Sequence, residues 1–290
     1  MQYKKIGVIG GGTMGQGIAE MLAAKGLEVV LVEKDIERME HSWAMIELSL
    51  DKQLEKWAIT GAEKKLILSR IHKTTDLKEL PSCHMVIETI SEDLDLKKSL
   101  FRKLDEICGP DLILASNTST LSLTELGAST KHPERVIGLH FIHPVAKIDL
   151  VEIIRGLKTS EDTYMLTRRF VEDVIQKTAI KVYESPGFVT SRLICLLINE
   201  AVHTLAERVA SAEDIDLAMR KGYEFRHGPL EMADRFGLDS VLAALDRMFR
   251  EFGELKYRPS FLLKQMVHAG HLGVKTGEGF FRYDKEGDRM

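Results

Sequence analysis

A glycine-rich segment constrains this chain most, because it stands between a strand pattern and a helix pattern. The apolar run 5–9, KIGVI, is followed by Gly10, Gly12 and Gly15. Residues 16–25 then continue with helical spacing, so the glycines fit G-x-G-x-x-G in the context that gives this motif its meaning. Gly10 permits the tight turn, Gly12 lets a pyrophosphate approach the backbone, and Gly15 lets the helix pack on the strand. The segment predicts a parallel sheet that binds a dinucleotide.

An acidic residue at the end of the next strand pattern bears on which dinucleotide is bound. Residues 27–33, LEVVLVE, predict a second buried strand, and Glu33 lies 21 positions beyond Gly12. A carboxylate at this distance accepts hydrogen bonds from ribose hydroxyls and repels a 2′-phosphate. The pattern therefore favours NAD over NADP, an assignment that the neighbouring basic Lys34 weakens.

The region after this strand departs from a plain alternation of strands and helices. Residues 37–57 have the spacing of a long amphipathic helix, Gly61 interrupts it, and residues 63–71 continue as a second helical piece. A plain connection back to the sheet is shorter than this. We therefore expect a helical hairpin over residues 36–71 that projects from the domain. A solvated decoration without a ligand is the alternative.

Two further strand patterns end in polar residues. Residues 85–90, MVIETI, predict a core strand, and Glu88 within it is expected at the crevice end, because a buried charge is costly unless it is paired or faces a ligand. Residues 112–115 predict the next strand, which runs into the turn 116–120, SNTST. Such a turn is either an ordinary helix cap or a place that holds a substrate oxygen, with Ser119 as the candidate.

A histidine and a glutamate on neighbouring β-forming runs are the candidate catalytic pair. The run 135–141 predicts a strand that ends near His140, and Glu152 lies twelve positions further along, beyond a break at Pro144. A histidine at the crevice of an α/β sheet can take a proton from an alcohol, and a buried glutamate can fix its tautomer and stabilise the imidazolium. The alternative is a core histidine beside an unrelated glutamate. Metal binding by His140 and His143 is disfavoured, because positions three apart on an extended chain point to opposite faces.

The remainder of the chain predicts a second, all-helical domain. Beyond Pro186 apolar residues recur with helical spacing, notably over 193–209, and only residues 279–283 have a strand-like pattern. We therefore expect an α/β Rossmann-type, doubly wound sheet in residues 1–185, carrying the projecting helical hairpin. An all-α domain follows in residues 186–290.

Composition limits the partners and the compartment. The net charge of −4 is made of dispersed charges of both signs, which points to no nucleic-acid partner. No apolar run approaches the roughly 20 residues needed to cross a bilayer, which predicts no membrane contact. The three cysteines are widely spaced and odd in number, which argues against a disulfide framework or a Cys-based zinc site and favours the reducing cytoplasm.

Several motifs stand in order along nearly the whole chain. They are GGGTMG at 10–15, SNTS at 116–119, GLHF at 138–141, LVEI at 150–153, SPGF at 185–188, GP at 228–229 and KTGEGF at 275–280. With them the chain resembles the L-3-hydroxyacyl-CoA dehydrogenases, of the 3-hydroxybutyryl-CoA dehydrogenase type. The resemblance implies a reversible, NAD-dependent oxidation of a short-chain L-3-hydroxyacyl-CoA to the 3-ketoacyl-CoA.

The resemblance also implies roles for particular residues in the first domain. His140 matches the general base of the family, Glu152 matches its acidic partner, and Ser119 matches the serine that binds the 3-oxygen of the substrate. Glu88 and Asn117 are implied to lie along the NAD.

Other implied features concern the substrate and the assembly. The projecting hairpin is implied to contact the CoA moiety, and Ser49 and Lys56 fall where the family uses such residues. Helix 193–209 is rich in apolar residues, which is more often typical of a core, but the resemblance implies that part of this surface buries against a second subunit in a homodimer formed through the C-terminal domain.

The chain departs from the family pattern at three places. His143 stands before Pro144 where the family has asparagine, and Ser191 stands where the family has an asparagine that touches the substrate. A serine there is a shorter donor and leaves room for a water. Arg226 and His227 replace a Pro-Met pair in the second domain.

These departures leave two alternatives open. One is a dehydrogenase of a free 3-hydroxy acid, such as a carnitine- or gulonate-type substrate, in which Arg226 would meet the carboxylate. The other is a non-catalytic NAD-binding protein, against which the retained pair of His140 and Glu152 argues.

Overall fold

One continuous sheet organises the first part of the chain. The structure, a computed structural model, describes residues 3–290. Its eight-stranded sheet has the order β3-β2-β1-β4-β5-β6-β7-β8, and every neighbouring pair is parallel except β6 with β7. The strands are β1 (Lys5–Ile9), β2 (Glu28–Val32), β3 (Ile71–Thr74), β4 (Met85–Glu88), β5 (Ile113–Ser116), β6 (Val136–Phe141), β7 (Leu150–Arg155) and β8 (Thr178–Tyr183). The strand order reverses between β1 and β4, which is where such a sheet opens its ligand crevice.

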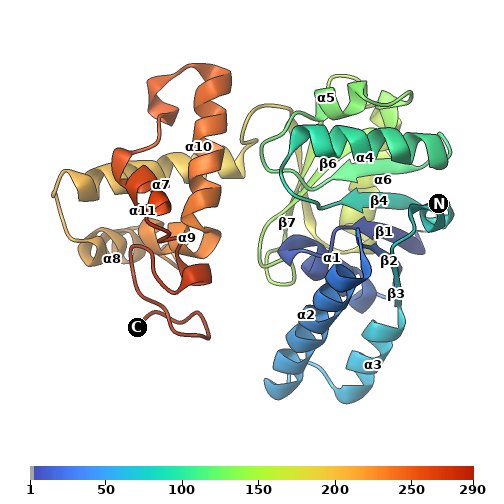
Figure 1. The fold of residues 1–290 in the computed structure, drawn as a ribbon, viewed down its shortest axis with the longest axis horizontal. Coiled ribbons are helices and arrows are strands. Elements are labelled where there is room, and N and C mark those ends of the chain that lie inside the picture. Colours follow the sequence, from blue (N-terminus) through green and yellow to red (C-terminus); the bar gives the residue numbers. More distant parts are fainter. Residues whose placement is uncertain (1–2) are drawn as a thin grey trace. The chain divides into compact units, whose positions relative to one another are not determined.

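Helices cover both faces of this sheet (Figure 1). They are α1 (Thr13–Ala24), α2 (Ile36–Glu55), α3 (Gly61–Ser69), η1 (Leu77–Ser82), α4 (Leu94–Ile107), α5 (Leu123–Ala128), η2 (Pro133–Arg135), α6 (Glu161–Arg169) and the π-helical η3 (Phe170–Val174). Along β1 the side chains alternate: Ile6 and Val8 share a core with Ile18 of α1, whereas Gly7 faces Leu80 of η1. The prediction of a doubly wound, Rossmann-type sheet is confirmed.

The helical hairpin projects from the sheet as α2 and α3 (Figure 1). A Thr60–Glu63 capping box begins α3, with hydrogen bonds of 2.7 and 3.2 Å. The prediction that helix continues to residue 71 was wrong, because α3 ends at Ser69 and β3 begins at Ile71. This strand pairs with β2 and only Ile71 in it is buried, so it lacks the long apolar run of the other strands.

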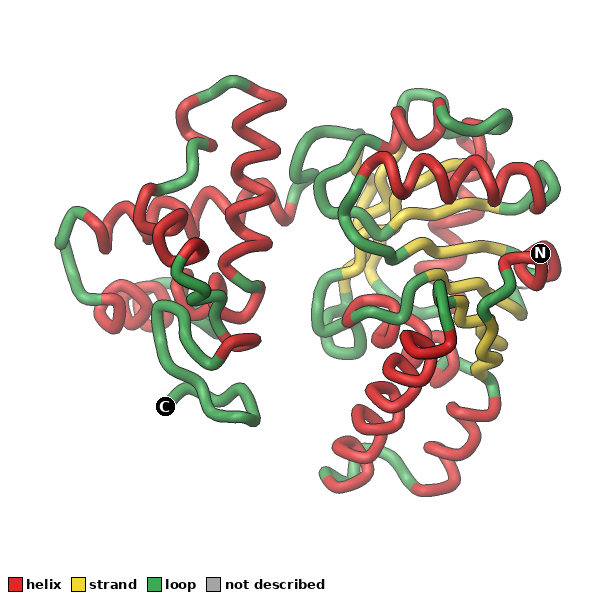
Figure 2. The backbone as a smooth tube through the Cα atoms, in the orientation of Figure 1, coloured by secondary structure: helices red, strands yellow, loops and turns green. Residues whose placement is uncertain are grey.

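The second unit begins at Pro186 and consists of helices and loops (Figure 2). Its helices are α7 (Thr190–Ala206), α8 (Ala212–Gly222), α9 (Pro229–Phe236), α10 (Leu238–Phe252), η4 (Leu255–Tyr257), α11 (Phe261–His268) and η5 (Val274–Thr276). The strand-like pattern at 279–283 forms no strand, only isolated bridges. The reason lies in Asp234, whose carboxylate accepts the backbone N–H groups of Phe280 and Phe281, at 2.9 Å each.

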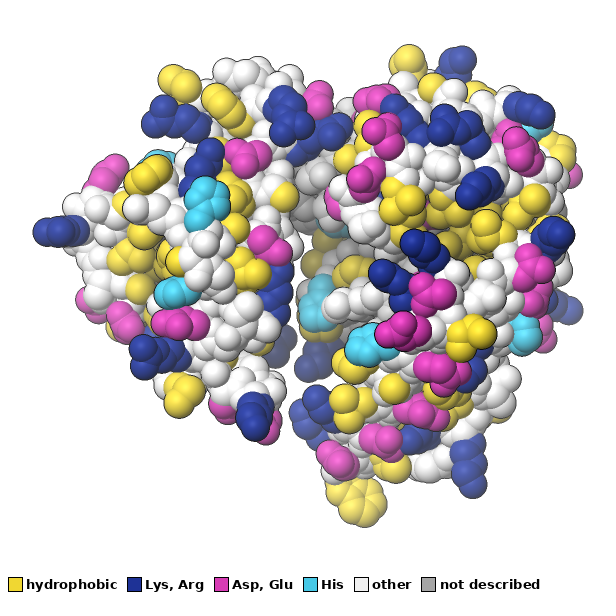
Figure 3. Space-filling view, in the orientation of Figure 1, with side chains coloured by type: hydrophobic (Ala, Val, Ile, Leu, Met, Phe, Trp, Pro, Cys, Tyr) yellow, Lys and Arg dark blue, Asp and Glu magenta, His cyan; other side chains and the backbone are white. Residues whose placement is uncertain are grey.

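Surface properties are ordinary in both units. Side chains of both charge signs are interspersed over the visible face of each unit (Figure 3). Among residues 3–290, no helix combines the length and the apolar character required to cross a bilayer. All three cysteines are buried free thiols.

Candidate active site

The glycine loop between β1 and α1 shows why glycine is needed at Gly10 and Gly15, which pack against the protein's own backbone. Gly10 has a φ of 94°, in the left-handed region that favours glycine. A Cβ atom on Gly15 would lie 1.8 Å from the carbonyl oxygen of Gly10. A Cβ atom on Gly12 would meet nothing within 4 Å. The protein's own packing therefore demands glycine at 10 and 15, whereas the space beside Gly12 is open.

The start of α1 fits an anionic ligand. Gly12 is the N-cap residue, and no side chain caps this end of the helix. The first turn carries no acidic residue. Backbone N–H groups and the positive end of the helix dipole are thus directed to the space beside Gly12, which suits the pyrophosphate of a dinucleotide.

Glu33, directly after β2, is fixed beside this loop. Its Oε1 accepts hydrogen bonds from the backbone N–H of Gly11, at 2.6 Å, and from the hydroxyl of Ser42 in α2, at 3.3 Å. A Cβ atom on Gly11 would lie 2.3 Å from the Ser42 oxygen, so glycine is required at position 11 as well. Sequence reasoning missed Gly11 and Ser42, because the motif treats position 11 as variable.

Glu88 ends β4 and is fully buried. Its carboxylate accepts hydrogen bonds from Lys97 Nζ at 2.7 Å, from the backbone N–H of Ile90 at 2.7 Å and from the Ser116 hydroxyl at 2.6 Å. Burial raises the pKa of Glu88, while Lys97 and the other donors oppose this. Glu88 lies at the crevice end of β4, as expected. Both of its carboxylate oxygens accept hydrogen bonds from within the protein. Its contact with NAD stays a prediction.

The turn after β5 is tied to the end of β6. The side-chain oxygen of Asn117 accepts a hydrogen bond from the backbone N–H of Phe141, at 2.9 Å. Two residues further on, the hydroxyl oxygen of Ser119 lies 3.1 Å from Nε2 of His140. The turn therefore brings a hydroxyl to the histidine, which the sequence alone left as one of two possibilities.

His140 and Glu152 meet because β6 and β7 pair antiparallel with these two residues in direct register. Nδ1 of His140 lies 2.6 Å from Oε2 of Glu152. His140 is 5% exposed and Glu152 is fully buried. His143, by contrast, is exposed in the connection between the strands, so it does not share the environment of His140.

The two ring nitrogens of His140 face different partners. Nδ1 faces the Glu152 carboxylate and Nε2 faces the Ser119 hydroxyl. A ring nitrogen and a hydroxyl group thus converge where a single alcohol oxygen could bind both.

Sequence reasoning missed a further acid near the site, Glu92. Its Oε1 accepts hydrogen bonds from the backbone N–H groups of Ser119 and Thr120, at 3.0 and 3.1 Å, and from the hydroxyl of Thr118. Burial alone would raise the pKa of Glu92, but Lys97 and these donors hold it below the usual value. The local sequence gave no signal for this role, since an acid before a helix is common.

The predicted substrate residues lie elsewhere in the two units. Ser49 is half-buried in α2, and Lys56 is exposed at the end of the same helix. In the second unit, Ser191 is half-buried in the first turn of α7. Arg226 is exposed before α9, and its neighbour His227 is bound to Glu231, with 2.8 Å between Nδ1 and Oε1.

Comparisons with known proteins find matches to both units of the chain. The family model described as 3-hydroxyacyl-CoA dehydrogenase, NAD binding domain, matches residues 5–185, and the model of the C-terminal domain matches residues 187–283. A 3-hydroxybutyryl-CoA dehydrogenase of Clostridioides difficile is 43% identical over 281 residues, which are 97% of this chain and 100% of that protein.

Solved structures agree with the sequence comparisons. M. tuberculosis FadB2 superposes with a TM-score of 0.96 at 37% identity, covering 98% of this chain and 100% of that one. The (S)-3-hydroxybutyryl-CoA dehydrogenase PaaH1 from Ralstonia eutropha gives a TM-score of 0.91 at 42% identity, with the same coverage. The chain therefore belongs to the 3-hydroxyacyl-CoA dehydrogenase family and is an NAD-dependent oxidoreductase.

Proposed function

We propose that the protein interconverts a short-chain L-3-hydroxyacyl-CoA, such as 3-hydroxybutyryl-CoA, and the 3-ketoacyl-CoA. The observation that carries this proposal is the hydrogen-bonded series of Ser119, His140 and Glu152 on the dinucleotide-binding sheet. The names of similar proteins, 3-hydroxybutyryl-CoA dehydrogenases among them, support the choice of substrate.

In the oxidative direction His140 acts as the general base. Its Nε2 takes the proton of the 3-hydroxyl group, while Glu152 orients the ring and stabilises the imidazolium that forms. Ser119 holds the same oxygen by a hydrogen bond. Bound NAD supplies the acceptor for the hydride that leaves C3. In the reverse direction His140 returns the proton to the 3-oxygen.

The cofactor contacts are part of the proposal. Gly10, Gly12 and Gly15 form the loop that admits the pyrophosphate, and Glu33 accepts the ribose hydroxyls. The uncapped start of α1 and the open space beside Gly12 support this arrangement. We propose Asn117 as a residue that lines the NAD.

Glu88 is assigned an indirect role in NAD binding. Its buried carboxylate already accepts hydrogen bonds from Lys97, Ile90 and Ser116. Because these bonds fix the ends of β4 and β5, we propose that Glu88 serves NAD binding by shaping the mouth of the crevice.

The substrate contacts are proposed on two elements. Ser49 and Lys56 are seven residues apart, about two turns of helix, so both positions share one side of the α2 region and are assigned to the CoA moiety. Ser191 is assigned to the acyl group, where its short side chain leaves room for a water.

We also propose that the protein is a cytoplasmic homodimer formed through the C-terminal domain. Large apolar side chains on this unit support dimerisation, since Leu193 is 64% exposed and Phe261 is 72% exposed. Light scattering of the purified protein tests this, with a mass twice the 32.7 kDa of one chain as the expected result. The mass of a single chain would contradict it.

The test of the reaction is NADH oxidation followed by absorbance, with acetoacetyl-CoA and free acetoacetate in parallel. Turnover of the thioester alone is the expected result. Turnover of acetoacetate alone would favour the free 3-hydroxy acid, with Arg226 as the carboxylate partner. Turnover of neither, with NADH still bound, would contradict the proposed substrate class.

A further inference from the structure

The acidic side chain of Glu92 is bound to a loop that belongs to a different strand. Glu92 precedes α4, whereas the turn of residues 118–120 follows β5. Donors from all three residues of this turn converge on Oε1 of Glu92: the backbone N–H groups of Ser119 and Thr120, and the hydroxyl groups of Thr118 and Thr120. Hydrogen bonds to an ionised acceptor are about twice as strong as neutral ones. One carboxylate oxygen therefore organises the whole turn.

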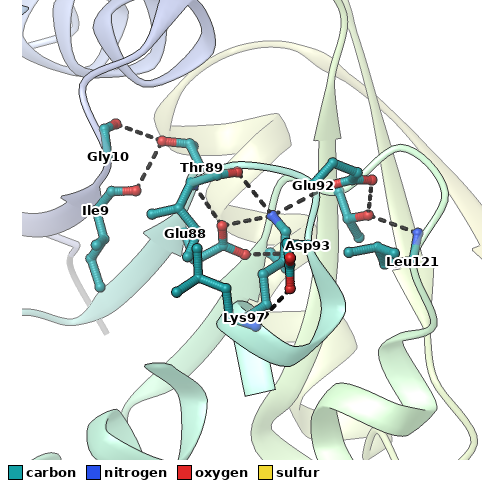
Figure 4. A network of polar contacts seen from close by, with 12 residues as sticks. Ile9, Gly10, Glu88, Thr89, Glu92, Asp93, Lys97 and Leu121 are labelled. Carbon is teal, nitrogen blue, oxygen red and sulfur yellow. Dashed lines mark hydrogen bonds and ion pairs between the residues drawn. The ribbon is translucent and has the colours of Figure 1, made fainter. Parts of the chain in front are cut away.

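Glu92 itself is fixed from the other side. The next residue, Asp93, caps α4 by accepting the backbone N–H of Leu96 at 2.9 Å. Nζ of Lys97, one turn into that helix, lies 3.4 Å from Oε2 of Glu92 and 2.7 Å from Oε1 of Glu88. Figure 4 shows Lys97 between the two acids. Because Lys97 is 1% exposed, solvent screens this ammonium little.

The same segment is attached to the glycine loop. The hydroxyl of Thr89 donates to the carbonyl oxygens of Ile9 and Gly10, at 3.0 and 2.7 Å (Figure 4). Residues 88–93 thus contact two parts of the site. Thr89 bonds to the glycine loop, and Glu92 bonds to the turn that carries Ser119.

We propose that Glu92 is a positioning residue for Ser119, and this rests on the proposed function. Glu92 holds the backbone of Ser119 so that its hydroxyl stays at hydrogen-bond distance from Nε2 of His140, where the 3-oxygen of the substrate binds. Misplacing a binding group by about 1 Å can cost on the order of 100-fold in rate. Loosening the turn should therefore slow the reaction even though Glu92 takes no part in the proton transfer.

Glu92→Gln tests this proposal. The substitution keeps the size of the side chain but removes its charge, and an amide cannot accept with both of its ends, so the donors of the turn or Lys97 lose their partner. We expect kcat with acetoacetyl-CoA to fall by about 10- to 100-fold. Glu125→Gln is the matched control, because Glu125 is likewise exposed and paired with a lysine of α4, Lys98 at 2.6 Å, but lies outside the turn of residues 118–120. It should keep kcat within about twofold.

A double-mutant cycle with Ser119→Ala shows whether Glu92 acts through the serine. If it does, Glu92→Gln costs less than about twofold in the Ser119→Ala background. An equal loss in both backgrounds would overturn the proposal, because Glu92 would then act on the reaction by another route.

Two outcomes distinguish a failure of the proposed function from a failure of the positioning proposal. If Ser119→Ala leaves kcat unchanged, the role of Ser119 in the proposed function is wrong and the positioning proposal falls with it. If Ser119→Ala lowers kcat but Glu92→Gln has no effect, only the positioning proposal is wrong. Melting temperatures verify folding, and Glu92→Asp, which keeps the charge but shortens the side chain, replaces Glu92→Gln if that variant does not fold.

Discussion

His140 and Glu152 are direct partners across the antiparallel pair of β6 and β7, with Nδ1 2.6 Å from Oε2. Two strands of one sheet hold these side chains, so their separation does not depend on a flexible loop. The pair is thus held by the hydrogen-bonded ladder of the sheet, as the proposed roles of base and orienting acid require.

Replacement of Glu152 tests how much its negative charge contributes to catalysis. Glu152→Gln keeps the shape and can still accept the Nδ1 proton, but it no longer stabilises the imidazolium. We expect kcat in the oxidative direction to fall by roughly 100-fold, with the affinity for NADH nearly unchanged. Steady-state kinetics and a fluorescence titration with NADH measure the two effects. A kcat equal to that of the wild type would exclude Glu152 as the partner of the base.

The glycine loop provides a matched pair of variants. Gly15→Ala places a methyl group 1.8 Å from the oxygen of Gly10, so the melting temperature should fall by several degrees or the protein should not fold. Gly12→Ala meets no protein atom within 4 Å, so its stability should match that of the wild type while NADH binds at least about tenfold more weakly. Unaltered NADH affinity of Gly12→Ala would contradict the pyrophosphate assignment.

Glu33 is predicted to select NAD. Glu33→Gln can still accept the Gly11 N–H but no longer repels a 2′-phosphate, and Lys34 stands beside it. The ratio of kcat/KM for NADH to that for NADPH should fall by about tenfold or more. Glu37→Gln, an exposed acid in the first turn of α2, is the control and should leave the ratio unchanged. A constant ratio in Glu33→Gln would remove Glu33 from cofactor selection.

Asp234 in α9 is predicted to make the stability of the second unit depend on pH. Its carboxylate is 1% exposed and accepts hydrogen bonds from Phe280, Phe281 and Tyr283, yet burial raises its pKa to about 6. The folded state therefore binds more protons than the unfolded state between about pH 4 and pH 6. The stabilising contribution is complete below about pH 4 and is lost as the pH rises through 6.

Asp234→Asn removes this titration and provides the measurement. The unfolding free energy of the wild type minus that of the variant should decrease from pH 4 to pH 6.5, by up to about 3 kcal/mol. Denaturant titrations of both proteins at each pH give the difference. A difference that rises with pH would show that the pKa is lowered on folding.

The sequence predicts much of the fold because the strands and helices carry their periodicity locally. The glycine loop, Glu33 and the hairpin follow from residues close together in the chain. The strand β3 was missed because Ile71 is its one buried side chain. The end of the hairpin was misplaced for the same reason.

The site was predictable only in part. The pattern around His140 and Glu152 predicted two neighbouring strands, but a slip of one residue would place Glu152 on the opposite face, so the register needed the structure. Glu92 could not be found from its neighbours. Its role depends on the turn of residues 118–120, which the crossover through α4 and β5 brings back to it. Such long-range contacts have no local signature.

The central claim is that His140 transfers the proton at the 3-oxygen, and His140→Gln tests it most directly. We would measure kcat for the reduction of acetoacetyl-CoA together with the dissociation constant of NADH, for the wild type and this variant. Loss of the proton donor should lower kcat by about 100- to 10,000-fold, while the NADH dissociation constant changes by less than about threefold. A kcat within a few-fold of the wild type would contradict the account, because the pair of His140 and Glu152 would then be structural.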